Sequence, residues 1–324
     1  MPSEFPPVRW GPEVAAAARV LIELARDEDL AGGVDWTTAA TVDATQRGEA
    51  TVVSRQAGVA AGMEIGPLVL QAFEADAQWR PLVADGATLA PGTAMAVMRG
   101  RAADLLTCER TVLNFVGKLS GVASLTRAYA DRIAAAGATA QLYDTRKTTP
   151  GWRLLEKFAV GCGGGKNHRL GLSEAVLIKD NHLALSGEAG LTAADAVGRA
   201  REVAAQRPAA GDAAMVVQVE VDTLAQLEEV LPAQPDIVLL DNMGPERLAE
   251  AVAMRDAAAG PHGHRAVLEA SGGVNLDTIG KIAASGVDRV SVGALTHSAA
   301  CLDVGLDWGL DWGLDWGDAR AASG

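Results

Sequence analysis

Charged side chains and glycines follow a series of short apolar runs in the second half of this 324-residue chain. Five such runs end in Arg146 with Lys147, in Lys179, in Glu220, in Asp241 and in the Ser-Gly-Gly triplet at 271–273. The carboxyl ends of parallel strands open onto one face of a barrel, and barrel enzymes place their active sites on that face. The pattern therefore predicts one site assembled from several strand ends.

The segment 144–180 is a basic island in an acidic chain. It holds seven Lys or Arg and four Asp or Glu, whereas the whole chain carries a formal net charge of −13. Arg binds planar carboxylates through its forked donors, and Lys supplies a point charge for phosphates. His168 lies beside Arg169 in this segment and is a further candidate for ligand contact. We therefore expect a strongly negative ligand.

Two glycine-containing strings are suited to phosphate. SGGVN at 271–275 is expected to open a helix, and SVGALTHS at 291–298 follows the last apolar run. Glycine lets backbone N–H groups point at one anion, and (β/α) barrels commonly hold a phosphate at these strand ends. A simple tight turn is the alternative for each string alone, and their pairing favours a phosphate site.

Glu220 and Asp241 form a carboxylate pair at neighbouring strand ends in a site that is otherwise basic. The pair could bind Mg²⁺ that itself holds phosphate oxygens, or it could stabilise positive charge that develops at a sugar carbon. Structural salt bridges to nearby Arg and Lys side chains are the alternative.

Composition and motifs disfavour several classes of function. The net charge of −13 repels nucleic acid and anionic membrane surfaces, and we expect neither as a partner. The glycine-rich GCGGGKNHR is not a Walker loop, because Asn167 stands where the motif needs Ser or Thr. No signal peptide or membrane span is visible. Three widely spaced cysteines without a CxxC pair indicate reduced thiols and a cytoplasmic protein.

Hydrophobic patterning predicts an α/β fold in two parts. Near-continuous apolar runs predict parallel strands covered on both faces, and helical segments such as LDTIGKIAAS separate the later ones, which favours a (β/α) barrel with fewer than eight strands. The six runs are QLYDTR, AVLIKD, MVVQVEV, DIVLLDN, AVLEAS and DRVSVG.

The part of the chain before the barrel has a different hydrophobic pattern. An amphipathic helix is expected at 12–26, a small mixed α/β domain at 48–99 with a helix near 65–75, and two helices at 101–118 and 120–136. The tail repeats LDVG once and LDWG three times over 302–317. Its period of two predicts an amphipathic strand, which we interpret as a repeat expansion of an existing terminal strand.

A set of longer strings then points to a family. They are ERTVLNFVGKLSGVASLT (109–126), DTRKTTPGWR (144–153), GGGKNHRLGL (163–172), LIKDNH (177–182), LLDN (239–242), EASGGV (269–274) and SVGALTHS (291–298). With these strings in this order, the chain resembles quinolinate phosphoribosyltransferase, also called carboxylating nicotinate-nucleotide pyrophosphorylase, over about residues 28–304. It departs from the family at GGVDWTT (32–38), where a compact GDITT-like turn is usual, and in the extra LDWG copies.

The resemblance implies an incomplete (β/α) barrel at 117–299 and a smaller N-terminal α/β sandwich domain at 1–116, which the final strand in 300–324 rejoins. It implies transfer of phosphoribosyl from phosphoribosyl pyrophosphate to quinolinate with decarboxylation. The products would be nicotinate mononucleotide, CO₂ and pyrophosphate, in de novo NAD biosynthesis. It further implies a homodimer with shared active sites, and leaves open whether dimers form a hexamer.

The resemblance also assigns roles to residues of this chain. The quinolinate carboxylates would be held by Arg110 reaching from the partner subunit, and by Arg146, His168, Arg169 and Lys179. Lys147, Glu220 and Asp241 would be the catalytic residues at phosphoribosyl pyrophosphate, and Glu220 and Asp241 would hold Mg²⁺ directly or through water. Ser271, Gly272, Gly273, Gly293 and Ala294 would bind the 5-phosphate.

Two rival functions stay open. The first is a related transferase with a different aromatic acceptor, such as a protein associated with molybdenum uptake that shares this architecture. The second is a barrel that binds phosphosugars as a regulator without catalysis. The Arg146, Arg169 and Arg110 set disfavours the first, and the Lys147, Glu220 and Asp241 set disfavours the second.

Overall fold

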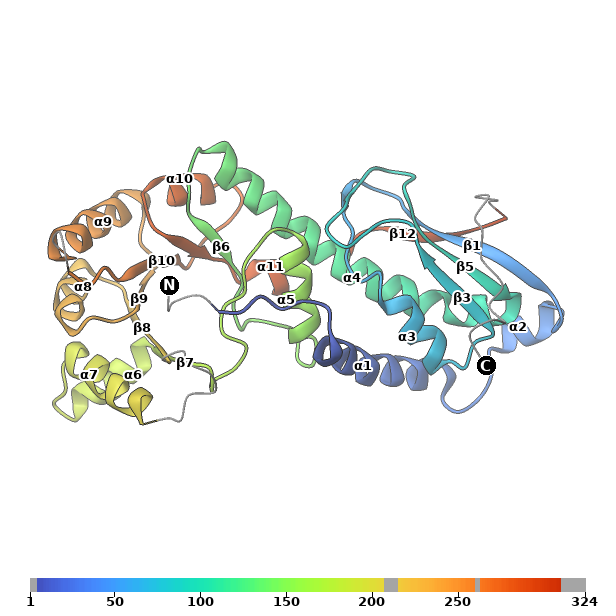
Figure 1. The fold of residues 1–324 in the computed structure, drawn as a ribbon, viewed down its shortest axis with the longest axis horizontal. Helices are drawn as coiled ribbons and strands as arrows, with labels where there is room; N and C mark the ends of the chain where they lie inside the picture. Colours follow the sequence, from blue (N-terminus) through green and yellow to red (C-terminus); the bar gives the residue numbers. More distant parts are fainter. Residues whose placement is uncertain (1–4, 207–214, 260–262, 310–324) are drawn as a thin grey trace. The chain divides into compact units, whose positions relative to one another are not determined.

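The computed structural model describes residues 5–206, 215–259 and 263–309 (Figure 1). The chain divides into two compact units, Met1–Val14 with Val122–Ala300 (the barrel unit) and Ala15–Gly121 with Cys301–Gly324 (the sandwich unit). The domain boundaries expected from the sequence, at 116/117 and 299/300, stay a prediction, because compactness alone does not define an independently folding domain. No helix of the described residues is long and apolar enough to span a membrane.

The barrel unit contains one six-stranded parallel sheet. Its strands are β6 (Gln141–Tyr143), β7 (Ala175–Ile178), β8 (Val216–Val221), β9 (Ile237–Asp241), β10 (Val267–Ser271) and β11 (Arg289–Ser291). They pair in the order β6-β11-β10-β9-β8-β7. All six strands expected from the sequence are present. The edge strands β6 and β7 do not pair with each other, so the expected incomplete barrel is confirmed.

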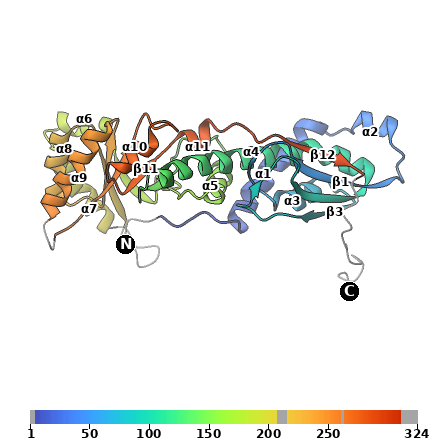
Figure 2. The ribbon, with the colours of Figure 1, turned by 90° about the horizontal axis from the view of Figure 1, so that it is seen from above.

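Helices cover the outside of these strands, which explains why most strand residues are apolar on both faces. The helical segments are α5 (Arg153–Cys162), α6 (Asp180–Glu188), α7 (Ala193–Ala205), α8 (Leu224–Val230), η1 (Leu231–Ala233), α9 (Pro245–Ala259), α10 (Ile279–Ala284) and α11 (Ala294–His297). Helices α6 to α10 contact one another in succession (Figures 1 and 2). Capping boxes at Thr192 and Thr223 fix where α7 and α8 begin.

The sandwich unit is built on an antiparallel sheet. Its elements are α1 (Pro12–Leu30), α2 (Trp36–Thr41), β1 (Arg47–Ser54), β2 (Gly58–Val59), α3 (Ile65–Ala72), β3 (Ala77–Pro81), β4 (Thr88–Leu89), β5 (Ala94–Arg101) and β12 (Val304–Trp308). The main sheet has the order β12-β1-β5-β3, and β2 pairs with β4. The small α/β domain and the returning final strand are therefore confirmed. Strand β12 begins at Val304 in the LDVG copy and ends at Trp308 in the first LDWG copy, and the two later copies lie outside the described residues.

One expectation about helices was wrong. Residues Ala102–Ala135 form a single 34-residue helix, α4, where the sequence suggested two helices. The helix runs through Gly117, although glycine costs about 1 kcal/mol relative to alanine inside a helix. A Cβ on Gly117 would lie 3.0 Å from the carbonyl oxygen of Leu302. The backbone N–H of Leu302 donates to the Gly117 carbonyl at 2.8 Å. The glycine therefore admits the chain that leads into β12.

Candidate active site

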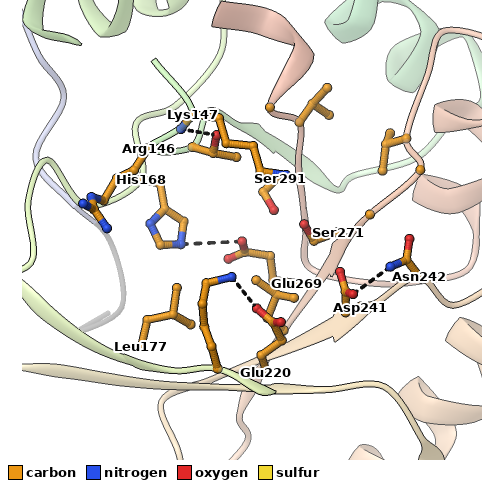
Figure 3. A pocket seen from close by; sticks show the side chains of 18 of the residues that line it. Arg146, Lys147, His168, Leu177, Glu220, Asp241, Asn242, Glu269, Ser271 and Ser291 are labelled. Carbon is orange, nitrogen blue, oxygen red and sulfur yellow. Dashed lines mark hydrogen bonds and ion pairs between the residues drawn. The ribbon is translucent and has the colours of Figure 1, made fainter. Parts of the chain in front are cut away.

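The carboxyl ends of the parallel strands and the loops that follow them surround a cavity of about 770 Å³ in the barrel unit (Figure 3). Every predicted site residue except Arg110 lines it: Arg146, Lys147, His168, Arg169, Lys179, Glu220, Asp241, Ser271, Gly272, Gly273, Gly293 and Ala294. Arg110 is an exposed residue of α4 and belongs to the sandwich unit. The structure thus gathers the strand-end residues, and their individual roles stay predictions.

Two arginines form the cationic side of the cavity. Arg169 is 5% exposed, and its Nη1 donates to the carbonyl oxygen of Ala175 at 2.8 Å. Within the described residues, Nε of Arg146 and Nε of Arg169 are both buried without a hydrogen-bond partner. Burial and the charge of Arg146 lower the pKa of Arg169. A negative ligand in the cavity would relieve the repulsion between the two guanidinium groups.

His168 is buried at the same side of the cavity and holds a defined tautomer. Its Nδ1 accepts from the backbone N–H of Arg169 at 2.9 Å, so the ring proton lies on Nε2. Nε2 is 3.0 Å from Oε1 of Gln218 and donates to it. Burial lowers the pKa of His168, and the nearby Glu269 only partly opposes this effect. The imidazole is therefore neutral, with both nitrogens engaged by the protein.

Glu269 is a cavity residue that the sequence analysis missed. It lies on β10 with no exposed surface, and its Oε1 is 3.6 Å from Nε2 of His168 (Figure 3). Its Oε2 accepts from Nε2 of Gln218 at 3.3 Å and lies 3.7 Å from Nε of Arg289. The signal was present, since Gln218, Glu269 and Arg289 are polar residues inside otherwise apolar strands. Buried polar groups in strand interiors are uncommon unless they are paired.

Two carboxylates face the cationic side across the cavity. In Figure 3, Glu220 and Asp241 lie on one side, and Arg146, Lys147 and His168 lie on the other. Oε2 of Glu220 is 2.8 Å from Nζ of Lys179, and Oδ2 of Asp241 accepts from Nδ2 of Asn242 at 2.7 Å. The salt bridge expected as an alternative for Glu220 therefore exists. Its partner Lys179 also lines the cavity.

Glu220 and Asp241 supply carboxylate oxygens, the kind of ligand that Mg²⁺ binds. The described residues contain no group of three His, Cys, Asp or Glu side chains that could hold a metal ion. Mg²⁺ commonly keeps several waters and binds one or two carboxylates together with substrate phosphates. Glu220 and Asp241 fit that second arrangement, in which the substrate supplies the remaining oxygens.

Backbone conformation and close contacts explain why glycine occupies three positions of the cavity. Gly272 and Gly273 have φ values of +85° and +64°, a region that other residues rarely adopt. A Cβ on Gly272 would lie 2.4 Å from Oδ1 of Asn242. A Cβ on Gly293 would lie 2.9 Å from Cδ of Lys147, so this glycine lets the lysine side chain pass close to the backbone.

The expectation that SGGVN opens a helix was wrong. Helix α10 begins at Ile279, after a turn in which Oδ1 of Asn275 accepts from the backbone N–H groups of Asp277 and Thr278. An asparagine side chain that binds the backbone two or three residues ahead forms a turn and delays the helix. The loop at 271–274 thus meets the cavity as irregular backbone.

Part of the basic island is structural. Nζ of Lys157 forms a fully buried ion pair with Asp144, and it also donates to the His168 carbonyl at 2.8 Å. Burial lowers the pKa of Lys157 and raises that of Asp144. Arg153 donates to the Leu170 carbonyl at 2.9 Å. Lys157 and Arg153 are therefore not cavity-lining cations, and they order the loop that carries His168 and Arg169.

The fold and the site together define a class: a parallel α/β-barrel protein whose cavity, at the carboxyl ends of the strands, is lined by both basic and acidic side chains. Residues 122–307 match the family described as "Quinolinate phosphoribosyl transferase, C-terminal domain", and residues 35–120 match its N-terminal domain. The chain belongs to the quinolinate phosphoribosyl transferase family.

Individual relatives agree with this assignment. The chain is 44% identical over 293 residues to a protein of Mycobacterium leprae named nicotinate-nucleotide pyrophosphorylase [carboxylating], covering 90% of this chain and 96% of that one. It is 36% identical over 279 residues to a protein of Synechocystis named as a probable enzyme of the same kind, covering 86% and 88%. The solved nicotinate-nucleotide pyrophosphorylase of Francisella tularensis superposes with a TM-score of 0.82 at 32% identity, covering 94% and 100%.

Proposed function

We propose that this protein transfers phosphoribosyl from phosphoribosyl pyrophosphate to quinolinate with decarboxylation, in de novo NAD biosynthesis. The products are nicotinate mononucleotide, CO₂ and pyrophosphate. One observation carries the proposal: in a chain of this family, Arg146 and Arg169 line a single cavity together with a carboxylate pair and two glycine loops. That arrangement suits a planar dianion on one side and a phosphorylated sugar on the other.

The quinolinate side is built from Arg146, Arg169 and Lys179, with His168 beneath them. Quinolinate carries two carboxylates on adjacent ring carbons. The forked donors of a guanidinium group bind a carboxylate through paired hydrogen bonds. Because Arg146 and Arg169 repel each other, a dianion is favoured over a monoanion such as nicotinate. His168 contributes a neutral ring edge and not a further positive charge.

The phosphoribosyl pyrophosphate side combines Lys147, Glu220 and Asp241 with the two glycine loops. Ser271, Gly272 and Gly273, together with Gly293 and Ala294, offer backbone N–H groups to the 5-phosphate. Glu220 and Asp241 would hold Mg²⁺, directly or through water, and the ion would neutralise pyrophosphate charge. Lys147 supplies a further cation for the leaving group.

The chemistry requires no protein nucleophile. The C1–O bond to pyrophosphate breaks and leaves positive charge at C1, which the carboxylates of Glu220 and Asp241 stabilise. The ring nitrogen of quinolinate then bonds to C1. The resulting cationic ring withdraws electrons, so the adjacent carboxylate leaves as CO₂ and a proton takes its place on the ring carbon. The main contribution of the pocket is to hold the two anionic substrates close together in the orientation that the reaction requires.

The direct test is release of pyrophosphate when purified protein is mixed with Mg²⁺, phosphoribosyl pyrophosphate and quinolinate. Nicotinate in place of quinolinate separates this function from a transferase with another acceptor, since equal use of the monoacid would contradict the dianion pocket. Binding of phosphoribosyl pyrophosphate without any release of pyrophosphate would favour the alternative function, a regulator that binds phosphosugars without catalysis.

The proposal includes a homodimer in which Arg110 of one protomer completes the pocket of its partner. Arg110 is exposed on α4 and lies outside the cavity of its own barrel unit. Mixing inactive Arg110→Ala protein with inactive Glu220→Ala protein should restore activity, because mixed dimers then contain one intact site. Mixtures that stay inactive after subunit exchange would contradict shared sites, and light scattering would separate a dimer from a hexamer.

A cytoplasmic location also belongs to the proposal. Cys108, Cys162 and Cys301 form no disulfide in the described part of the chain, which suits a reducing compartment. Cell fractionation with an antibody against the protein tests this location.

A further inference from the structure

Residues 5–10, here called the N-terminal strap, run along the barrel unit beside the loop that carries His168 and Arg169. The strap precedes both regions that match the family, which begin at residue 35. It is anchored at its far end by Trp10, whose ring packs edge-on against Phe158 of α5 with centroids 5.3 Å apart. Its other contacts reach the candidate active site from the side opposite the cavity.

Phe5 supports His168 directly. The two rings have centroids 5.1 Å apart and are tilted by 32°. Phe5 also packs against a buried cluster formed by Ala175, Val216 and Ile237, the first residues of β7 and β8 and the first of β9. His168 lines the cavity and Phe5 does not, so Phe5 meets the candidate site through its contact with the His168 ring.

A hydrogen bond also joins the strap to Asn167, the residue that precedes His168 in the loop. The backbone N–H of Val8 donates to Oδ1 of Asn167 at 2.7 Å. Nδ2 of Asn167 donates to Oδ2 of Asp144 at 2.7 Å, and the backbone N–H of His168 donates to Oδ1 of Asp144 at 2.7 Å. The loop is therefore held by the strap on one flank and by the buried Asp144–Lys157 pair on the other.

The strap has a consequence for the ligand side of the loop. Without Phe5, an apolar space would open behind the His168 ring, and the ring could move away from the cavity. Arg169 would move with it, because its backbone N–H donates to Nδ1 of His168. Sites need their side chains within about half an ångström of the productive position, so a small shift would weaken binding of a planar dianion.

We propose that Phe5 is a positioning residue for the acceptor pocket, and that it fixes His168 and thereby Arg169 for quinolinate. The proposal rests on the proposed function for the identity of the acceptor, and on the described contacts for the position. Phe5 touches no substrate and takes no part in bond making. It should therefore affect the Michaelis constant for quinolinate and leave turnover at saturation nearly unchanged.

The kinetic test compares Phe5→Ala and Phe5→Leu with wild type. We expect Phe5→Ala to raise KM for quinolinate about tenfold, with kcat and KM for phosphoribosyl pyrophosphate changed less than about twofold. Phe5→Leu refills part of the space and should recover most of the loss. The matched control is Val197→Ala, which truncates a fully buried residue of α7 in the same unit and should leave both KM values unchanged.

A double-mutant cycle identifies the route of the effect. In a His168→Ala background the phenyl ring has nothing to hold, so adding Phe5→Ala should raise KM for quinolinate by less than about twofold. Independent, additive effects of the two substitutions would overturn the proposal. A loss of kcat with unchanged KM for quinolinate would also overturn it, because that pattern indicates a merely structural role.

Hydrogen exchange gives a readout that needs no activity. In both Phe5 variants the backbone amides of 166–170 should exchange faster than in wild type, in graded order, while those of β10 keep their protection. Unchanged exchange at 166–170 in folded protein would overturn the proposal. If the wild-type protein failed to use quinolinate, the proposed function would fall, and the exchange comparison would still decide whether Phe5 positions the loop.

Discussion

Replacing Glu220 by Gln removes one negative charge from the cavity and keeps the shape of the side chain. Oε2 of Glu220 accepts a hydrogen bond from Nζ of Lys179 at 2.8 Å, and the amide oxygen of Gln can accept the same bond. The change therefore isolates charge from packing. If Glu220 stabilises the positive sugar carbon in the transition state, turnover should fall while the fold is retained.

The burial of Glu220 determines the size of the effect. Its side chain is 12% exposed, so an effective dielectric constant of about 20 is more suitable than the value of about 80 for water. At about 4 Å, a unit charge then stabilises an opposite charge by about 4 kcal/mol. Lys179 cancels part of this, and halving the figure leaves about 2 kcal/mol. The expected loss of kcat is thus about 30- to 1000-fold.

Steady-state release of pyrophosphate at saturating substrates measures this loss. The control is Glu250→Gln, which removes the same charge from an exposed position of α9 that does not line the cavity. KM for quinolinate should not rise, because Lys179 keeps its full charge. A kcat within threefold of wild type would refute the reasoning, and so would a loss confined to KM.

Three further predictions concern separate groups. Arg169→Lys should raise KM for quinolinate at least about tenfold, because a point charge cannot replace forked donors, and unchanged steady-state kinetics would contradict this. Burial lowers the pKa of His168 below its ordinary 6.5, so the unfolded state binds more protons below that pH. The free energy of unfolding in urea should therefore fall from pH 7.5 to 5.5, and fall less in His168→Gln. Burial, with a smaller effect of Asp104, raises the pKa of Cys108 to about 12, so iodoacetamide at pH 8 should label exposed Cys301 first by mass spectrometry.

The parallel strands were predictable because their signal is local. Each expected strand is a short apolar run, and burial on both faces leaves no other role for such a run in an α/β protein. The convergence of Arg146, Lys179, Glu220 and Asp241 on one cavity followed from strand direction alone. Parallel strands that share a sheet must present their carboxyl ends at the same edge.

What the sequence could not show depends on distant partners. Gly117 breaks a helix by propensity, and only its contact with the Leu302 backbone reveals why α4 continues through it. Lys157 and Arg169 look alike as members of one basic island in the sequence. In the structure, Lys157 pairs with the buried Asp144 away from the cavity, whereas Arg169 lines the cavity. Neither distinction is local, because each depends on which residue the fold brings alongside.

The acidic character of the whole chain and the cationic side of the cavity, formed by Arg146 and Arg169, are compatible for a physical reason. Exposed charges are screened over about 8 Å at physiological salt, so most of the net charge of −13 has little influence inside the cavity. Buried charges are screened much less, and the buried Arg169 and the half-buried Arg146 both line the cavity. The two guanidinium groups therefore act on a ligand at short range. An acidic surface then selects against polyanions too large to enter the cavity, while small dianions reach the arginines.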